Sequence, residues 1–134
     1  MHQLNTPTIW LVDDDEDDQH LVRSAFLDCQ PSITIVVLDD GEELLPKLIE
    51  ADTLPQLILL DVNMPRKNGF DTLEQLRSIA DYAHLPVVML TTSSSEQDRQ
   101  RSLALGANHF LTKPLTYQQL RQLAQEISHQ WMLT

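Results

Sequence analysis

The stretch Leu57–Gly69, LILLDVNMPRKNG, joins an apolar run to an acid and a loop-forming segment. Four consecutive apolar residues, Leu57 to Leu60, are typical of a strand that is buried on both faces of a parallel sheet. Asp61 ends this run, so the predicted strand Leu57–Asp61 carries a carboxylate at its carboxyl end, where open α/β sheets bind their ligands. Taken alone, Asp61 could equally cap the loop that follows it.

Length and composition indicate a globular chain. The 134 residues are 42% hydrophobic and 22% charged, which suffices for one domain with a substantial core. We expect a single domain over residues 1–134, with its core at about 8–127. The single cysteine, Cys29, excludes an internal disulfide and a multi-cysteine zinc site.

The net charge and the N-terminal sequence limit the partners and the cellular location that we expect. A net charge of −11 argues against nucleic acid as a direct partner, because phosphate contacts require lysine and arginine. No run approaches the roughly 18 apolar residues of a membrane span. The first ten residues lack the basic and apolar regions of a signal peptide, so we expect a cytoplasmic protein without membrane contact.

Strand-like and helix-like segments alternate along the rest of the chain. Four further strands are predicted, at Thr8–Val12, Ile33–Leu38, Val87–Leu90 and His109–Thr112. A helical segment follows each strand, and the apolar stripes of the first and last helices are Leu21, Val22, Ala25 and Phe26, and Leu120, Leu123, Ile127 and Trp131. Pro46 should kink the second helix, Glu42–Glu50, or shift its start.

This alternation predicts an α/β fold with a parallel sheet and right-handed crossovers. The flavodoxin-like (βα)5 arrangement, with strand order 2-1-3-4-5, is the usual solution at this length. That order places the carboxyl ends of strands one and three side by side. Asp13 and Asp14, which follow the first strand, should therefore converge with Asp61.

Three converging carboxylates repel one another, by about 4 kcal/mol for two charges about 4 Å apart at an effective dielectric near 20. Such a cluster either raises a pKa or holds a hard cation. Carboxylate oxygens with open positions suit Mg²⁺, and Mn²⁺ is an alternative. We interpret the acids at 15–18 mainly as a solvated helix start. The acid run lacks the glycine and glutamate positions of an EF-hand.

Two more strand ends supply complementary groups. Thr91 ends the fourth strand and Lys113 follows the fifth, so both should face the edge that carries Asp61. A hydroxyl and an ammonium group beside metal-bound carboxylates are what a phosphoryl group on Asp61 would require. Each residue alone is unremarkable, and the signal lies in the combination.

These motifs resemble those of response-regulator receiver domains of two-component signalling. The residues that carry the resemblance are Asp13-Asp14 in LVDDD, Asp61 in LLDVNMP, Thr91 in MLTT and Lys113-Pro114 in FLTKP, with Gly69 and Gly106-Ala107. The match spans roughly Thr8 to Ile127, nearly the whole chain.

The resemblance implies that Asp61 accepts a phosphoryl group from a histidine kinase or a histidine phosphotransfer protein. Asp14, Asp61 and the backbone carbonyl of Asn63 would bind Mg²⁺, with Asp13 acting through water. The protein would catalyse only its own phosphorylation and dephosphorylation, and so would not be a conventional enzyme.

The resemblance also implies a switch. Thr91 would bond the phosphoryl oxygen, Phe110 would rotate inward behind it, and the face formed by helix four, strand five and helix five would change shape for an unknown downstream protein. The Lys113-Pro114 bond is expected to be cis. With no output domain after the last helix, we expect a stand-alone protein, either a monomer or a weak homodimer.

Two other classes stay open. An aspartyl phosphatase would usually carry a second acid two residues after its nucleophile, where this chain has Asn63. A degenerate receiver that only binds partners would not need the acids, Thr91 and Lys113 together. Thr92 stands where the family often has alanine, which predicts narrower access to the phosphoryl group and slower loss of phosphate.

Overall fold

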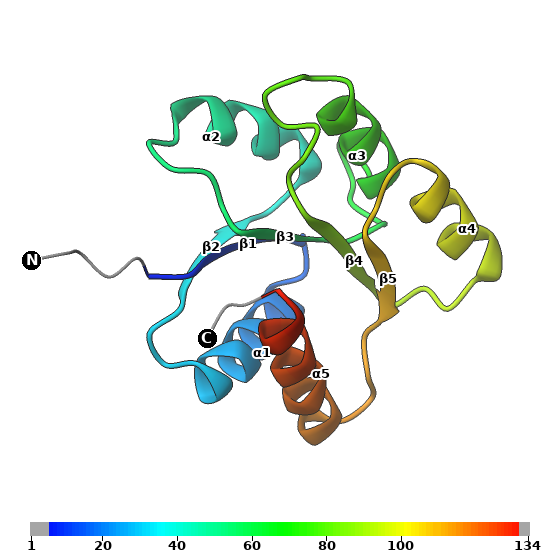
Figure 1. Ribbon diagram of the computed structural model, residues 1–134. Helices are drawn as coiled ribbons and strands as arrows, with labels where there is room; N and C mark the ends of the chain where they lie inside the picture. The colour runs from blue at the N-terminus through cyan, green and yellow to red at the C-terminus, as the bar shows by residue number, and fades with distance from the viewer. Residues whose placement is uncertain (1–5, 132–134) are drawn as a thin grey trace, which may run out of the picture.

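The structure, a computed structural model, describes residues 6–131, in which a central parallel sheet is covered by helices on both faces (Figure 1). The strands are Thr8–Val12 (β1), Thr34–Leu38 (β2), Leu57–Leu60 (β3), Val87–Thr91 (β4) and His109–Thr112 (β5). The α-helices are Glu16–Cys29 (α1), Leu44–Glu50 (α2), Gly69–Arg77 (α3), Glu96–Ala104 (α4) and Tyr117–Gln130 (α5), and a 3-10 helix, Gly41–Glu43 (η1), precedes α2.

The strand order is β2-β1-β3-β4-β5 with every pair parallel, which confirms the predicted flavodoxin-like fold. In the register, Val12 lies beside both Leu38 and Leu60. The residues that follow β1 and β3 therefore emerge next to each other, and the backbone N–H of Asp61 donates to the carbonyl of Val12 at 3.0 Å.

The sheet separates two hydrophobic clusters, because alternate residues of a strand point to opposite faces. One cluster includes Trp10, Ile58 and Met89 and lies on the side of α2 and α3. The other includes Leu11 and Leu59 and lies on the side of α1 and α5 (Figure 1).

The first helix differs from its predicted stripe at one position. Val22, Ala25 and Phe26 are buried, but Leu21 is 42% exposed, so its assignment to the core was wrong. Leu21 directly precedes Val22, and a helix turns by about 100° per residue, which carries Leu21 to the edge of the buried face.

Capping and proline chemistry fix the helix starts. η1 replaces the first residues of the predicted second helix, so that Pro46 is the third residue of α2, where a missing N–H costs no helical hydrogen bond. The N-caps Ser95 and Thr116 accept hydrogen bonds from the third residues of α4 and α5.

Within residues 6–131, no helix is long and apolar enough to cross a membrane.

Gly69 begins α3 directly against the strand end that carries Asp61. A β-carbon at this position would lie 2.2 Å from the backbone oxygen of Asp61, a distance that forces the backbone to move. The missing side chain is therefore a packing requirement of the β3–α3 connection.

We predict that Gly69→Ala lowers the free energy of unfolding by about 2 kcal/mol, because overpacking against backbone outweighs the gain in helix propensity. Urea denaturation followed by circular dichroism measures this change. The control, Glu74→Ala, alters an exposed residue of the same helix and should stay within about 0.5 kcal/mol of the wild type. Equal unfolding midpoints for the two variants would contradict the prediction.

Candidate functional site

The ends of β1 and β3 bring three acids together. Carboxylate oxygens of Asp13, Asp14 and Asp61 all lie within 4.8 Å of one another, so the predicted convergence is confirmed. Asp13 and Asp61 are buried, whereas Asp14 is exposed. The cluster is thus open to solvent on one side only.

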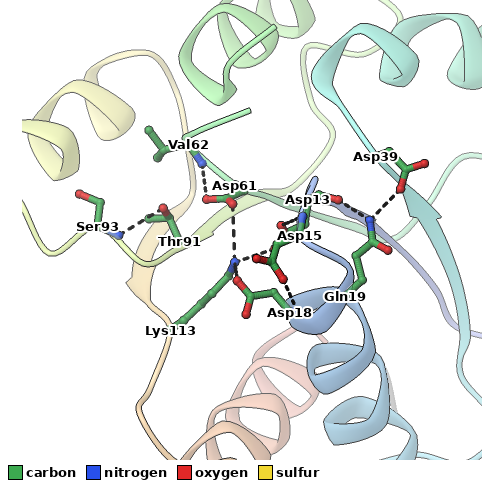
Figure 2. Close-up of polar contacts among 10 residues, drawn as sticks. All are labelled: Asp13, Asp15, Asp18, Gln19, Asp39, Asp61, Val62, Thr91, Ser93 and Lys113. Carbon is green, nitrogen blue, oxygen red and sulfur yellow. Dashed lines mark hydrogen bonds and ion pairs between the residues drawn. The ribbon is translucent and has the colours of Figure 1, made fainter. Parts of the chain in front are cut away.

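Local hydrogen bonds orient the two buried acids (Figure 2). One oxygen of Asp13 accepts the backbone N–H of Asp15 at 3.0 Å, and one oxygen of Asp61 accepts the backbone N–H of Val62 at 2.8 Å. The second oxygen of each acid faces the ammonium group of Lys113. Each carboxylate is therefore held at one oxygen and offers the other to the site.

Lys113 reaches the acids from the far end of the chain. Its backbone N–H donates to the carbonyl of Thr91 at 2.7 Å, which continues the β4–β5 pairing and sends the side chain back toward β1. Its Nζ lies 2.6 Å from Asp13, 2.8 Å from Asp18 and 3.6 Å from Asp61 (Figure 2). The predicted approach of Lys113 to Asp61 is present.

Asp18 is the residue of this site that sequence reasoning missed. Its assignment to a solvated helix start was wrong, because its carboxylate pairs with a buried lysine. A signal was available: Asp18, Val22 and Ala25 follow helical spacing, so Asp18 extends the buried stripe of α1 by one turn toward the end of β1. An acid on the inward face of a helix needs a partner.

Burial and pairing shift the ionisation of the site in opposite ways. Burial raises the pKa of Asp13 to about 6, although hydrogen bonds from Lys113 and from the N–H of Asp15 work against it. Burial by itself would lower the pKa of Lys113, but the hydrogen bonds to Asp13 and Asp18 outweigh it and leave the pKa above its ordinary value. Lys113 is therefore charged at neutral pH.

The loop after β3 is anchored by Asp40. Asp40 is buried, caps η1 through the N–H of Glu42, and accepts the backbone N–H groups of Arg66 and Lys67 at 3.0 Å each. Burial would raise the pKa of Asp40, but these hydrogen bonds outweigh it and lower the pKa. Nothing in the local sequence pairs residue 40 with residues 66 and 67.

Thr91 lies at the end of β4 and Phe110 lies within β5, as predicted from the sequence. Thr91 ends β4, is fully buried, and its hydroxyl oxygen lies 3.3 Å from the backbone N–H of Ser93. Phe110 lies in β5, is half-buried and packs against the core cluster on the α3 side. Their roles in a switch stay predictions, as does the metal-binding carbonyl of Asn63.

The prediction of a cis peptide bond between Lys113 and Pro114 was wrong. No cis peptide occurs within residues 6–131. The trans isomer is the intrinsically preferred one for an X–Pro bond, and with it the ammonium group of Lys113 already reaches Asp13 and Asp18.

The donor set fits a hard divalent cation, since three carboxylates supply anionic oxygens and Asp14 leaves an exposed approach. A cation would also relieve the mutual repulsion of these acids. The arrangement therefore suits a divalent cation beside Asp61.

We predict that Mg²⁺ affinity falls by about tenfold between about pH 7.5 and about pH 5, because protonation of Asp13 below its pKa of about 6 competes with the ion. In the ion-free protein, ionisation of Asp13 between about pH 4 and pH 6 should lower stability, since its folded pKa lies above the unfolded value. Titration calorimetry with Mg²⁺ at the two pH values measures the affinity.

The control for this titration is Asp81→Asn, which removes an exposed acid outside the cluster and should leave the pH dependence unchanged. Equal Mg²⁺ affinities at both pH values would contradict the assignment of Asp13 as the competing group.

Comparisons with known proteins agree with this geometry. The family model of the response regulator receiver domain matches residues 9–125. The chain is 34% identical over 131 residues to the response regulator Rcp1 of Synechocystis, covering 94% of this chain and 89% of Rcp1. It is 43% identical over 112 residues to the transcriptional regulatory protein CpxR of Klebsiella pneumoniae, covering 84% of this chain but only 45% of CpxR.

Solved structures give the same result. The phosphorylated cyanobacterial phytochrome response regulator RcpA superposes with a TM-score of 0.89 at 32% identity, covering 96% of this chain and 95% of RcpA. The Mn²⁺-bound form of Rcp1 superposes with a TM-score of 0.83 at 32% identity, covering 93% and 94% of the two chains.

Proposed function

The chain belongs to the response regulator receiver domain family of two-component signalling, and we propose that it is a phosphoacceptor in which Asp61 takes the phosphoryl group. The single observation that carries this proposal is the position of Asp61, a buried carboxylate that lies within 4.8 Å of carboxylate oxygens of Asp13 and Asp14 and 3.6 Å from the ammonium group of Lys113. Asp61 is the one acid of the cluster that lies at the end of the central strand β3.

The donor is a phosphohistidine of a histidine kinase or of a histidine phosphotransfer protein. A carboxylate oxygen of Asp61 attacks phosphorus, the O–P bond forms as the P–N bond breaks, and the imidazole leaves and takes up a proton. Lys113 stabilises negative charge on the transferring oxygens. Because the reaction modifies only the protein itself, the protein is not a conventional enzyme.

Mg²⁺, or Mn²⁺ in its place, would supply positive charge beside the phosphoryl oxygens. Asp14, Asp61 and the backbone carbonyl of Asn63 would hold it directly, with Asp13 acting through water. The acid cluster supports this assignment, and the Mn²⁺-bound structure of Rcp1 shows a divalent ion in a relative.

The signal then leaves through the face formed by α4, β5 and α5. Thr91 would bond a phosphoryl oxygen, and Phe110 would turn inward behind it. Within α4 only Ser102 is buried, so little apolar contact opposes a shift of this helix. A downstream protein would bind that face. The response regulator would be cytoplasmic, and either a monomer or a weak homodimer.

We predict that incubation with Mg²⁺ and acetyl phosphate adds one phosphoryl mass to the wild type, measured by intact-protein mass spectrometry. Asp61→Asn should take up none, because an amide cannot act as the nucleophile. Chelation of Mg²⁺ should suppress the wild-type adduct. An unmodified wild type would favour a binding-only receiver, and an adduct on the variant would place phosphorylation elsewhere.

We further predict that Thr92→Ala loses the phosphoryl group several-fold faster than the wild type. Thr92 is exposed and lines the groove beside Lys113. Its branched side chain would therefore narrow the path by which water reaches a phosphoryl group on Asp61. The decay of the adduct after donor removal gives the rate. Ser94→Ala, a change in the same groove, should leave the rate unaltered, and an unchanged rate for Thr92→Ala would refute the effect.

A further inference from the structure

The ammonium group of Lys113 is engaged by Asp18 more closely than by Asp61. An ammonium group has three N–H donors. Two of them are used at 2.6 Å by Asp13 and at 2.8 Å by Asp18, whereas the oxygen of Asp61 lies 3.6 Å away (Figure 2). Lys113 is thus held toward α1 and away from the residue that would carry the phosphoryl group.

The two close contacts differ in how easily they can break. The side chain of Asp13 is 0% exposed and is also tied to the N–H of Asp15, so it has no other place to go. The side chain of Asp18 is 29% exposed and lines an open groove of about 800 Å³ together with Thr92. A released Asp18 carboxylate would be hydrated at once, so the contact of Lys113 with Asp18 is the one that can open.

Asp18 also competes with the phosphoryl oxygens for Lys113. Three carboxylates, those of Asp13, Asp18 and Asp61, lie 2.6, 2.8 and 3.6 Å from the single ammonium group of Lys113. Asp18 therefore takes up an N–H donor of Lys113 that the phosphoryl oxygens need.

We propose that Asp18 is a positioning residue that restrains Lys113 and thereby slows transfer of a phosphoryl group to Asp61. The inference rests on the proposed function and concerns the regulation of the same site. Asp18 acts through Lys113 and does not itself touch the reacting atoms.

The structure allows a clean substitution. The backbone N–H of Asp18 donates to the side chain of Asp15, the N-cap of α1, and this bond does not involve the Asp18 carboxylate. Asp18→Asn removes the charge while keeping the shape and the cap. Asp17→Asn removes the same charge from an exposed neighbour in the same helical turn, and serves as the matched control.

The test compares initial rates of phosphoryl incorporation from acetyl phosphate at saturating Mg²⁺, followed by intact mass. We expect Asp18→Asn to react about three- to tenfold faster than the wild type, the range for loss of a partly exposed, charge-assisted hydrogen bond. Asp17→Asn should match the wild type. Asp18→Ser, which shortens the side chain as well, should accelerate the reaction like Asp18→Asn.

A double-mutant cycle with Lys113→Gln separates positioning from a structural effect. Without the ammonium group, Asp18→Asn should no longer change the rate, whereas a structural effect on α1 would persist. Equal or slower rates for both Asp18 variants, or acceleration that survives in the Lys113→Gln background, would overturn the inference while the proposed function stands. A wild type that takes up no phosphoryl group would refute the proposed function, and this inference with it.

Discussion

The pairing of Lys113 with Asp13 joins residues 100 positions apart and ties the last strand end to the first. Both groups are buried, so neither can exchange its partner for water, and removal of one would leave an uncompensated charge in the interior. The pair can form only if β1 and β5 lie at opposite sides of β3 and β4 with their ends level. The site therefore depends on the strand order and, through it, on the whole sheet.

The same pair does not neutralise the negative charge of the site. One ammonium group faces three carboxylates, and burial keeps the pKa of Asp13 near 6 in spite of its contact with Lys113. Such residual repulsion lowers stability in the resting protein and makes the binding of a cation favourable. Affinity for a divalent ion and reduced stability thus have one origin.

Sequence reasoning reached the fold and most of the site because both follow from where strands end. Once five apolar runs alternate with helices, the strand order is nearly determined, and Asp13, Asp14, Asp61, Thr91 and Lys113 fall at one edge. Asp18 was missed because it was interpreted as one of several solvated acids at the helix start, and its helical spacing from Val22 and Ala25 was not considered. Asp40 lay beyond reach, because its partners are backbone N–H groups far along the chain, and backbone groups carry no sequence signature.

Asp40 has a consequence for the affinity of the site for a cation. By accepting the N–H groups of Arg66 and Lys67, it shapes the segment after Asp61 through contacts within the protein alone. A cation arriving beside Asp61 would then meet a loop that is already in place, with little conformational entropy left to lose. Preorganisation of this kind lowers the entropic cost of binding, so that a cation held as proposed beside Asp61 would bind more tightly than it would beside a loop that has to order around it.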